Sequence, residues 1–102
     1  MVIWSDEAKA DLRMIYEFIA KDSKHYGRKV IQEIAIKADI LDSLPRLGRM
    51  MPEIGDENVR EIPMYSYRII YEILGQNVSI VAVAHKRRNI KPKILRESKP
   101  CP

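Results

Sequence analysis

Apolar and polar residues follow two different periods along this chain, and the change falls near its middle. Up to about residue 44 the apolar side chains recur every three or four positions, which is the spacing of one helix face. From residue 59 to residue 85 they gather in short runs rich in Val, Ile and Tyr, which is typical of strands. The pattern therefore predicts a helical first half and a sheet in the second half.

The first half begins with a short apolar run over residues 2–4, which predicts a strand. Ser5 is the expected N-cap of a first helix that extends to about Lys21, because a serine hydroxyl accepts a hydrogen bond from a first-turn amide. Residues 22–27 form a polar break. A second helix follows from about Gly27 to Leu44 and ends before Pro45, because proline disfavours the helical conformation in the residue before it. The two helices form a hairpin with one apolar face.

The second half opens with a loop over residues 46–58, which its glycines and prolines mark. We expect a short strand over Val59–Ile62, ended by Pro63. A hairpin of Tyr67–Leu74 and Val78–His85 follows, joined at residues 75–77. The last run carries few polar side chains, so we expect it to be covered on both faces. The predicted order is β-α-α-β-β-β and the fold class is α+β, with the helices on one face of a small, mainly antiparallel sheet.

Length and composition limit the remaining possibilities. The 102 residues predict a single domain over residues 1–97 and a disordered tail over residues 98–102. Apolar runs stay far below the roughly 20 residues that span a bilayer, and the first residues lack the pattern of a signal peptide. We therefore expect a cytoplasmic protein without membrane contact. One cysteine and two histidines do not form a zinc set, so we expect no metal and no cofactor.

The positive charge is concentrated at the C-terminal end. The formal net charge is +4, yet residues 85–102 carry seven Lys/Arg against one Asp/Glu. Such a segment attracts nucleic acid, an acidic protein or an anionic surface. The other interpretation is a solubilising tail without a target.

Several basic residues are expected at one end of the sheet. In a tight hairpin, Arg68 at the start of its strand lies close to His85 at the end of the next, and Arg60 on the preceding strand can join them. Basic side chains that lie together in this way can bind a phosphate group or stabilise the charge of a developing phosphorane. Alternatively these are solvated residues at strand ends, or they pair with Glu61 and Glu72.

Two residue types in the same region have both a chemical and a structural interpretation. His85 can act as a general acid or base near neutral pH, or border the core, since it shares strand parity with Val81 and Val83. Tyrosines can stack on bases. We assign Tyr71 to the core and leave Tyr65 and Tyr67 open.

Three short patterns follow one another along residues 2–90. The first is Trp4-Ser5 followed by Ala8, Asp11, Leu12 and Ile15-Tyr16. The second is Leu44-Pro45 with Gly48-Arg49 and Pro52-Glu53. The third is Val59-Arg60-Glu61-Ile62, then Tyr67-Arg68-Ile69-Ile70-Tyr71, then Val83-Ala84-His85 with Arg87-Arg88. In this order they resemble the RelE/ParE superfamily of toxins from bacterial and archaeal type II toxin–antitoxin systems.

The resemblance implies one of two activities. RelE-like members are ribosome-dependent mRNA endonucleases, and here Arg68, His85 and Arg87 would be their catalytic residues. ParE-like members inhibit DNA gyrase and need no catalytic set. Glu61 and Ile62 stand where a second lysine would help to complete a RelE-like site, and no tyrosine follows His85, so we favour the ParE-like branch. Its expected target-binding residues are Arg60, Arg68, His85, Lys86, Arg87 and Arg88.

Both branches imply a partner and leave a third possibility. A cognate antitoxin is expected to lie across the sheet and helices, mask the positive charge and form a hetero-oligomer with the toxin. Such segments are often disordered when free and fold on binding. The third possibility is a non-toxic module that binds an antitoxin without arresting growth.

Overall fold

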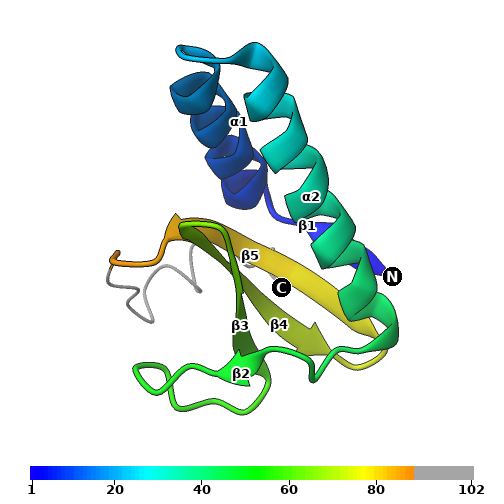
Figure 1. Cartoon of the computed structure of the whole chain (residues 1–102). Helices are drawn as coiled ribbons and strands as arrows, with labels where there is room; N and C mark the ends of the chain where they lie inside the picture. The colour runs from blue at the N-terminus through cyan, green and yellow to red at the C-terminus, as the bar shows by residue number, and fades with distance from the viewer. Residues whose placement is uncertain (89–102) are drawn as a thin grey trace.

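The computed structural model describes residues 1–88 (Figure 1). The expected disordered tail over residues 98–102, and the C-terminal end of the expected domain, lie outside the described residues. The predicted order of elements is confirmed, with one additional strand of two residues. The elements are β1 (Val2–Trp4), α1 (Asp6–Ala20), α2 (Lys24–Ser43), β2 (Arg49–Met50), β3 (Val59–Met64), β4 (Tyr67–Leu74) and β5 (Asn77–His85).

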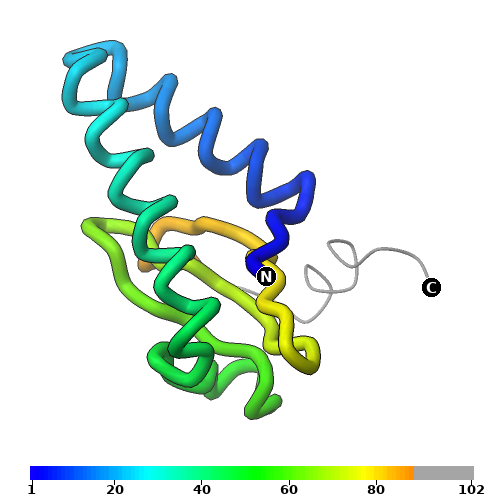
Figure 2. Tube along the Cα trace, turned by 90° about the vertical axis from the view of Figure 1, so that its right-hand side faces the viewer, coloured from blue at the N-terminus to red at the C-terminus, as the bar shows by residue number. Residues whose placement is uncertain are grey.

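The five strands form one sheet in the order β1-β5-β4-β3-β2. The pairs β2–β3, β3–β4 and β4–β5 are antiparallel, whereas β1 runs parallel to β5. Both helices lie on the same side of the sheet (Figures 1 and 2). The expected α+β fold with helices on one face is therefore confirmed, and β5 lies between β1 and β4 inside the sheet.

Apolar side chains cover β5 on both faces, as its lack of polar residues predicted. On the helix side, Val78, Ile80 and Val83 join a core with residues of α1 and α2. On the far side, a second cluster consists of Met51, Val59, Ile70, Val81, Ala82 and Ala84, with Ile54 packed against it. The loop between β2 and β3 thus supplies the cover of the far face.

A bulge interrupts the pairing of β4 with β5. Ile70 is opposite Ala82 and Tyr71 is opposite Ile80, so Val81 is the extra residue in β5. Because two consecutive residues, Val81 and Ala82, then face the far side, the alternation of side chains changes phase at this point.

Several predicted boundaries are wrong by a few residues. The break between the helices ends at Ser23, whose hydroxyl accepts a hydrogen bond from the Tyr26 amide at 3.1 Å. With Ser23 as its N-cap, α2 begins at Lys24, before the predicted start at about Gly27. Pro63 does not end β3, because β2 pairs with β3 only opposite Arg60 and Glu61. Pro63 therefore lies at an open edge, where the missing N–H leaves no partner unsatisfied.

The loops on either side of β3 and β4 also differ from the prediction. The additional strand β2 falls inside the predicted loop over residues 46–58, since two residues are too short to give a pattern. Leu74 pairs directly with Asn77, so the turn consists of Gly75 and Gln76 alone. Gly75 has a φ of 61°, the left-handed conformation that glycine adopts without steric cost.

Candidate functional site

Arg60 does not join Arg68, and this part of the prediction is wrong. Arg60 is opposite Tyr71, which belongs to the helix-side core, whereas Arg68 is opposite Ala84, which belongs to the far-side cluster. Since successive residues of a strand face opposite sides, the two guanidinium groups lie on different faces of the sheet. Arg60 instead donates to the carbonyl oxygens of Gly48 and Glu57, each at 2.9 Å, and so fixes the loop around β2.

His85 is also separated from Arg68. It is opposite Tyr67, and the two rings meet edge to face with their centroids 6.0 Å apart. Tyr67 packs against the helix-side core, so His85 lies on the face opposite to Arg68. The expectation that His85 shares its parity with Val81 is wrong, because the bulge turns Val81 to the far side, but the parity with Val83 holds.

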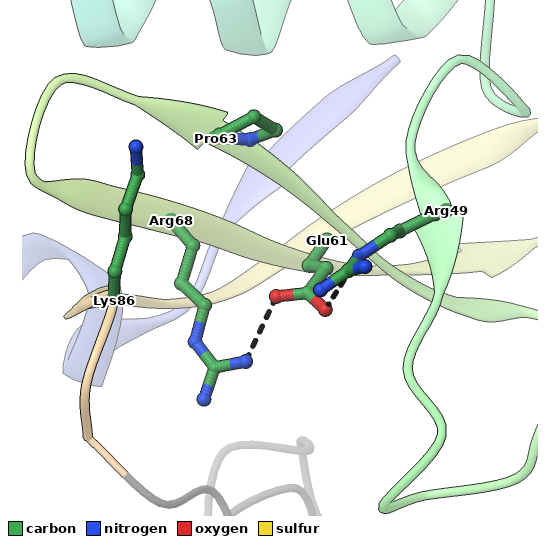
Figure 3. Close-up of a pocket in the computed structure, with 5 residues that line it drawn as sticks. All are labelled: Arg49, Glu61, Pro63, Arg68 and Lys86. Atoms are coloured by element: carbon green, nitrogen blue, oxygen red, sulfur yellow. Dashed lines mark hydrogen bonds and ion pairs between the residues drawn. The ribbon is translucent and has the colours of Figure 1, made fainter.

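Arg68 is buried in a network of ion pairs on the far side. Its side chain donates to Glu61 at 2.8 Å (Figure 3). The same guanidinium lies 3.6 Å from a carboxylate oxygen of Glu53. Arg49 donates to the other carboxylate oxygen of Glu61 at 3.1 Å. Arg68 and Glu61 are only 8% and 4% exposed, so the charge of Arg68 is largely neutralised before any ligand arrives. Of the two interpretations of Arg68, the one in which it pairs with Glu61 is therefore the one observed.

A cavity of about 350 Å³ opens beside this network. The residues that line it are Arg49, Glu61, Pro63, Arg68 and Lys86. The Lys86 side chain extends away from the guanidinium of Arg68 (Figure 3). Within the described residues, the Nε–H of Arg68 has no acceptor. This nitrogen is buried, so it is not presented to the cavity, where the Glu61 carboxylate repels anions and the side chains of Arg49 and Lys86 attract them.

A run of consecutive exposed basic residues lies at the end of β5. We call His85, Lys86, Arg87 and Arg88 the basic turn, and all four are exposed. The Arg88 amide donates to the His85 carbonyl at 3.0 Å, which closes the turn. The Arg87 amide donates to Nδ1 of His85 at 3.2 Å.

Two contacts from the sheet hold the basic turn in place. The Lys86 amide donates to the carbonyl of Ser66 in the β3–β4 turn at 2.9 Å. The Arg68 guanidinium donates to the Arg88 carbonyl at 2.5 Å. Arg68 thus positions the basic residues from beneath, and the expected cluster is reduced to four exposed side chains supported by one buried arginine.

The ion-pair network around Arg68 is only partly predictable from the sequence. Glu61 is a predicted counter-ion, whereas Glu53 lies in a loop and Arg49 in the two-residue strand β2, where no pattern indicates them. The pairing of Glu53 with Arg68 and of Arg49 with Glu61 depends on how the loop between β2 and β3 folds over the far face, which no local pattern specifies.

Two buried groups outside the basic turn have a raised pKa, and the charge of Arg88 acts against the rise at one of them, Asp11. Burial raises the pKa of Asp11, although the hydrogen bond from the Val83 amide at 2.9 Å acts against it. Burial also raises the pKa of Tyr71, opposed by the Gly48 amide that donates to its hydroxyl and by the charge of Arg60. Tyr71 is fully buried, which confirms its assignment to the core, and it donates to the Pro45 carbonyl at 2.7 Å.

The arrangement suits docking better than acid–base chemistry. Arg68 and His85 lie on opposite faces, so the described residues do not bring Arg68, His85 and Arg87 to one side of the sheet. Among residues 1–88 no group of three His, Cys, Asp or Glu side chains is placed to hold a metal ion. No helix in the same part of the chain is long and apolar enough to cross a membrane.

Comparisons with known proteins agree with the observed fold. A solved structure described as "Chromosomal ParDE TA system from P. aeruginosa" contains a chain that is 20% identical and superposes with a TM-score of 0.69, over 82% of this chain and 92% of that chain. At that identity the likeness shows the fold alone. No curated protein matches the sequence. The family described as "ParE toxin of type II toxin-antitoxin system, parDE" matches residues 2–90, so the chain belongs to the ParE toxin family of type II toxin–antitoxin systems.

Proposed function

We propose that this protein inhibits DNA gyrase and that a cognate antitoxin neutralises it. The proposal rests on the family and on one observation, the exposed basic turn fixed at the end of β5. A rigid patch of one charge steers a protein toward an oppositely charged surface and orients it there, without any chemical step. The basic turn is therefore the surface that we assign to the gyrase–DNA complex.

The helices carry a second surface that supports an antitoxin partner. Met14 and Phe18 on α1 are 60% and 68% exposed, and Ile36 on α2 is 60% exposed. Met14 and Phe18, four residues apart, lie on the same face of α1, and adjoining exposed apolar side chains favour a surface that a partner covers. A folding-upon-binding segment of the antitoxin can cover apolar helix residues and reach the basic turn.

The alternative of mRNA cleavage receives less support from the geometry. Attack by a ribose 2′-hydroxyl needs a base and phosphate-binding groups around one scissile bond. His85 and Arg68 lie on opposite faces of the sheet, and the guanidinium of Arg68 already donates a hydrogen bond to Glu61. The remaining cations of the basic turn can bind RNA phosphates but supply no such arrangement.

A supercoiling assay with purified gyrase, relaxed plasmid and ATP tests the proposal. We expect the wild-type protein to suppress supercoiling and to accumulate cleaved, protein-linked DNA. The variant Lys86→Ala/Arg87→Ala/Arg88→Ala is expected to need at least about tenfold more protein for the same effect, since each lost contact weakens binding by about 1 kcal/mol. The matched control is Lys9→Ala/Lys21→Ala/Lys29→Ala, which removes three exposed charges from the two helices and the turn between them.

The outcomes separate the candidate functions. If folded wild-type protein leaves gyrase unaffected at micromolar concentration but cleaves mRNA on translating ribosomes, the gyrase proposal is wrong. Normal growth of cells that contain the folded protein without an antitoxin would instead identify a non-toxic binding module. Equal loss in both triple variants would show that net charge, and not the basic turn, sets the affinity.

A further inference from the structure

The turn between β3 and β4 contains a bulky residue in an unfavourable backbone conformation. Tyr65 and Ser66 form a two-residue hairpin turn between Met64 and Tyr67, and Tyr65 has a φ of 58°. Glycine or asparagine normally occupies such a position, because a side chain there crowds the backbone. A tyrosine at this place indicates that its ring serves a purpose that outweighs the backbone cost.

Contacts with α2 hold the Tyr65 ring in place while leaving it accessible. Its ring meets the Tyr26 ring edge to face, with the centroids 6.5 Å apart, and its hydroxyl donates to Glu33. Tyr26 and Tyr65 nevertheless remain 45% and 38% exposed. The pair therefore presents fixed aromatic surfaces to solvent.

Two cavities meet at Tyr65 and Ser66. One, of about 320 Å³, has basic side chains in its wall, and it is lined by Tyr65, Ser66, His85, Lys86 and Arg87. The other, of about 240 Å³, is aromatic and apolar, and it is lined by Ile19, Tyr26, Val30, Tyr65, Ser66 and Tyr67. We call the two together the tyrosine cleft. Each is near the lower end of the range of ligand pockets, roughly 300–1,000 Å³, so each suits one small group.

A flat apolar group joined to an anionic group matches these two compartments, and a nucleotide has that composition. We propose that the tyrosine cleft binds single-stranded DNA, with a base against the tyrosines and the adjoining phosphate at Lys86 and Arg87. Stacking on aromatic rings beside a cationic groove is the usual way in which proteins bind single strands. A duplex keeps its bases stacked inside, so it can offer only its phosphates to the cleft.

The hydrogen bonds of the basic turn favour an anion in the cationic cavity. Nδ1 of His85 accepts a hydrogen bond from the Arg87 amide, so the neutral ring carries its hydrogen on Nε2. Nε2–H is then a donor suited to a phosphate oxygen, in addition to Lys86 and Arg87. Glu33 is the acidic side chain bonded to the Tyr65 hydroxyl, but it lines neither cavity.

The choice of DNA over RNA rests on the proposed function, since a gyrase inhibitor acts where DNA is cleaved. The cleft itself contributes the preference for a single strand. The tyrosine cleft thus supplies a specific contact with a single strand beside the basic turn, which the proposed function assigns to the gyrase–DNA complex as a whole.

Fluorescence anisotropy of a labelled oligothymidylate of about ten nucleotides, titrated with the purified protein at low salt, tests the inference. Tyr65→Gly removes the ring. Because glycine adopts a positive φ without steric cost, we expect this variant to keep the turn. We expect this variant to bind roughly 5- to 100-fold more weakly, the usual effect of losing one stacking ring. Tyr65→Phe keeps the ring and is expected to bind more tightly than Tyr65→Gly.

The salt dependence separates the phosphate contacts from the stacking contact. Lys86→Ala and Arg87→Ala are each expected to lower the slope of log affinity against log salt by about 0.7, the value for one phosphate of a single strand. Tyr65→Gly should leave the slope unchanged. The control Lys9→Ala removes an exposed charge that lines neither cavity and should change neither affinity nor slope.

The results that overturn the inference differ from those that overturn the proposed function. Equal binding by Tyr65→Gly and wild type, or equal binding of duplex and single strand, would exclude the tyrosine cleft as a single-strand site. Tighter binding of oligouridylate than of oligothymidylate would overturn the choice of DNA. Normal gyrase activity combined with ring-dependent binding of oligothymidylate would remove gyrase as the target and retain the cleft.

Discussion

Arg68 is buried together with its counter-ion, and its surroundings determine what a substitution at this position means. Glu61 and Glu53 neutralise it, and it donates to the backbone of the basic turn. Loss of function in an Arg68 variant would therefore report a displaced basic turn as readily as a lost ligand contact. Stability and target binding have to be measured together at this residue.

Paired substitutions at Arg68 and Glu61 test whether the two buried charges stabilise each other. Arg68→Met is expected to lower the free energy of unfolding by about 3–5 kcal/mol, because it leaves the Glu61 carboxylate buried without its main partner. Glu61→Leu should cost a similar amount, and Glu61→Leu/Arg68→Met should recover most of the loss. The control is Arg49→Met, whose side chain is 75% exposed and whose loss should cost about 1 kcal/mol or less.

Urea unfolding followed by circular dichroism gives the four free energies of this cycle. A double variant whose loss equals the sum of the two single losses would show that Arg68 and Glu61 do not stabilise each other. If the double variant is stable but inhibits gyrase poorly, unfolding is excluded as the cause, and inhibition requires the Arg68 side chain itself.

The raised pKa of Asp11 predicts that the free energy of unfolding depends on pH. Burial raises its pKa in the folded state, so the folded protein binds a proton more readily than the unfolded chain does. The contribution of Asp11 to stability is thus fully present below the unfolded pKa and is lost as the pH rises through the folded pKa. Asp11→Asn cannot ionise, and its amide oxygen can still accept from the Val83 amide.

Thermal or urea unfolding at several pH values compares the two proteins. The stability of Asp11→Asn relative to wild type should increase from pH 4 to pH 7. The group that lowers the pKa most, the Val83 amide, is retained in the variant. A relative stability that is constant with pH, or that falls, would contradict a raised pKa.

At the scale of the elements, the N-terminus of α1 completes one edge of β5. The strand β1 pairs with β5 only as far as Ile80. Beyond that point the Ser5 hydroxyl donates to the Val81 carbonyl at 2.9 Å and Asp11 accepts from the Val83 amide. Side chains of the first helix thus satisfy an edge that the short first strand leaves open.

The two helix caps allow this role to be measured. Ser5 and Ser23 each accept from the amide three residues ahead, at 3.0 and 3.1 Å, but only Ser5 also donates to the sheet. Ser23→Ala should lower the free energy of unfolding by about 1 kcal/mol, as is usual for an exposed cap. Ser5→Ala should cost about 1 kcal/mol more, because it also leaves the Val81 carbonyl without its donor. Equal losses in urea unfolding would show that the edge contact contributes nothing.

The elements could be predicted from the sequence to the extent that each carries its own pattern. The apolar stripes of the helices and the Ile- and Val-rich runs of β4 and β5 are of this kind. Short or exceptional segments were missed for physical reasons. The strand β2 has two residues, and Pro63 continues β3 only because the neighbouring edge is open.

At the scale of the whole molecule, the fold could be predicted but the grouping of the basic residues could not. Sequence parity gives the relative faces within one strand, but the faces across strands depend on register and on the bulge at Val81. Arg60 and Arg68 therefore appeared to belong together although they lie on opposite faces. Lys86, Arg87 and Arg88, in contrast, lie together whatever the register, because they are consecutive in the sequence.

The topology as a whole predicts where the protein is most resistant to opening. The strand β5 has apolar clusters on both faces, β4 along one edge, and β1 with the N-terminal part of α1 along the other. Any local opening that exposes its central amides must break all of these contacts together. The strand β2, in contrast, pairs only at Arg49 and Met50, at the outer edge of the sheet.

Native-state hydrogen exchange observed by NMR tests this ranking. We expect the amides of Ile80 and Val83 in β5 to exchange only by global unfolding, with a free energy equal to that from urea unfolding. The amides of β2 should exchange with a free energy lower by several kcal/mol. Asp11→Ala should leave the Ile80 amide at the global value and lower the protection of the Val83 amide alone, since only Val83 loses its acceptor. Uniform protection across β2 and β5 would contradict this ranking, because it would mean that the sheet opens as one unit and that its edges add nothing to local stability.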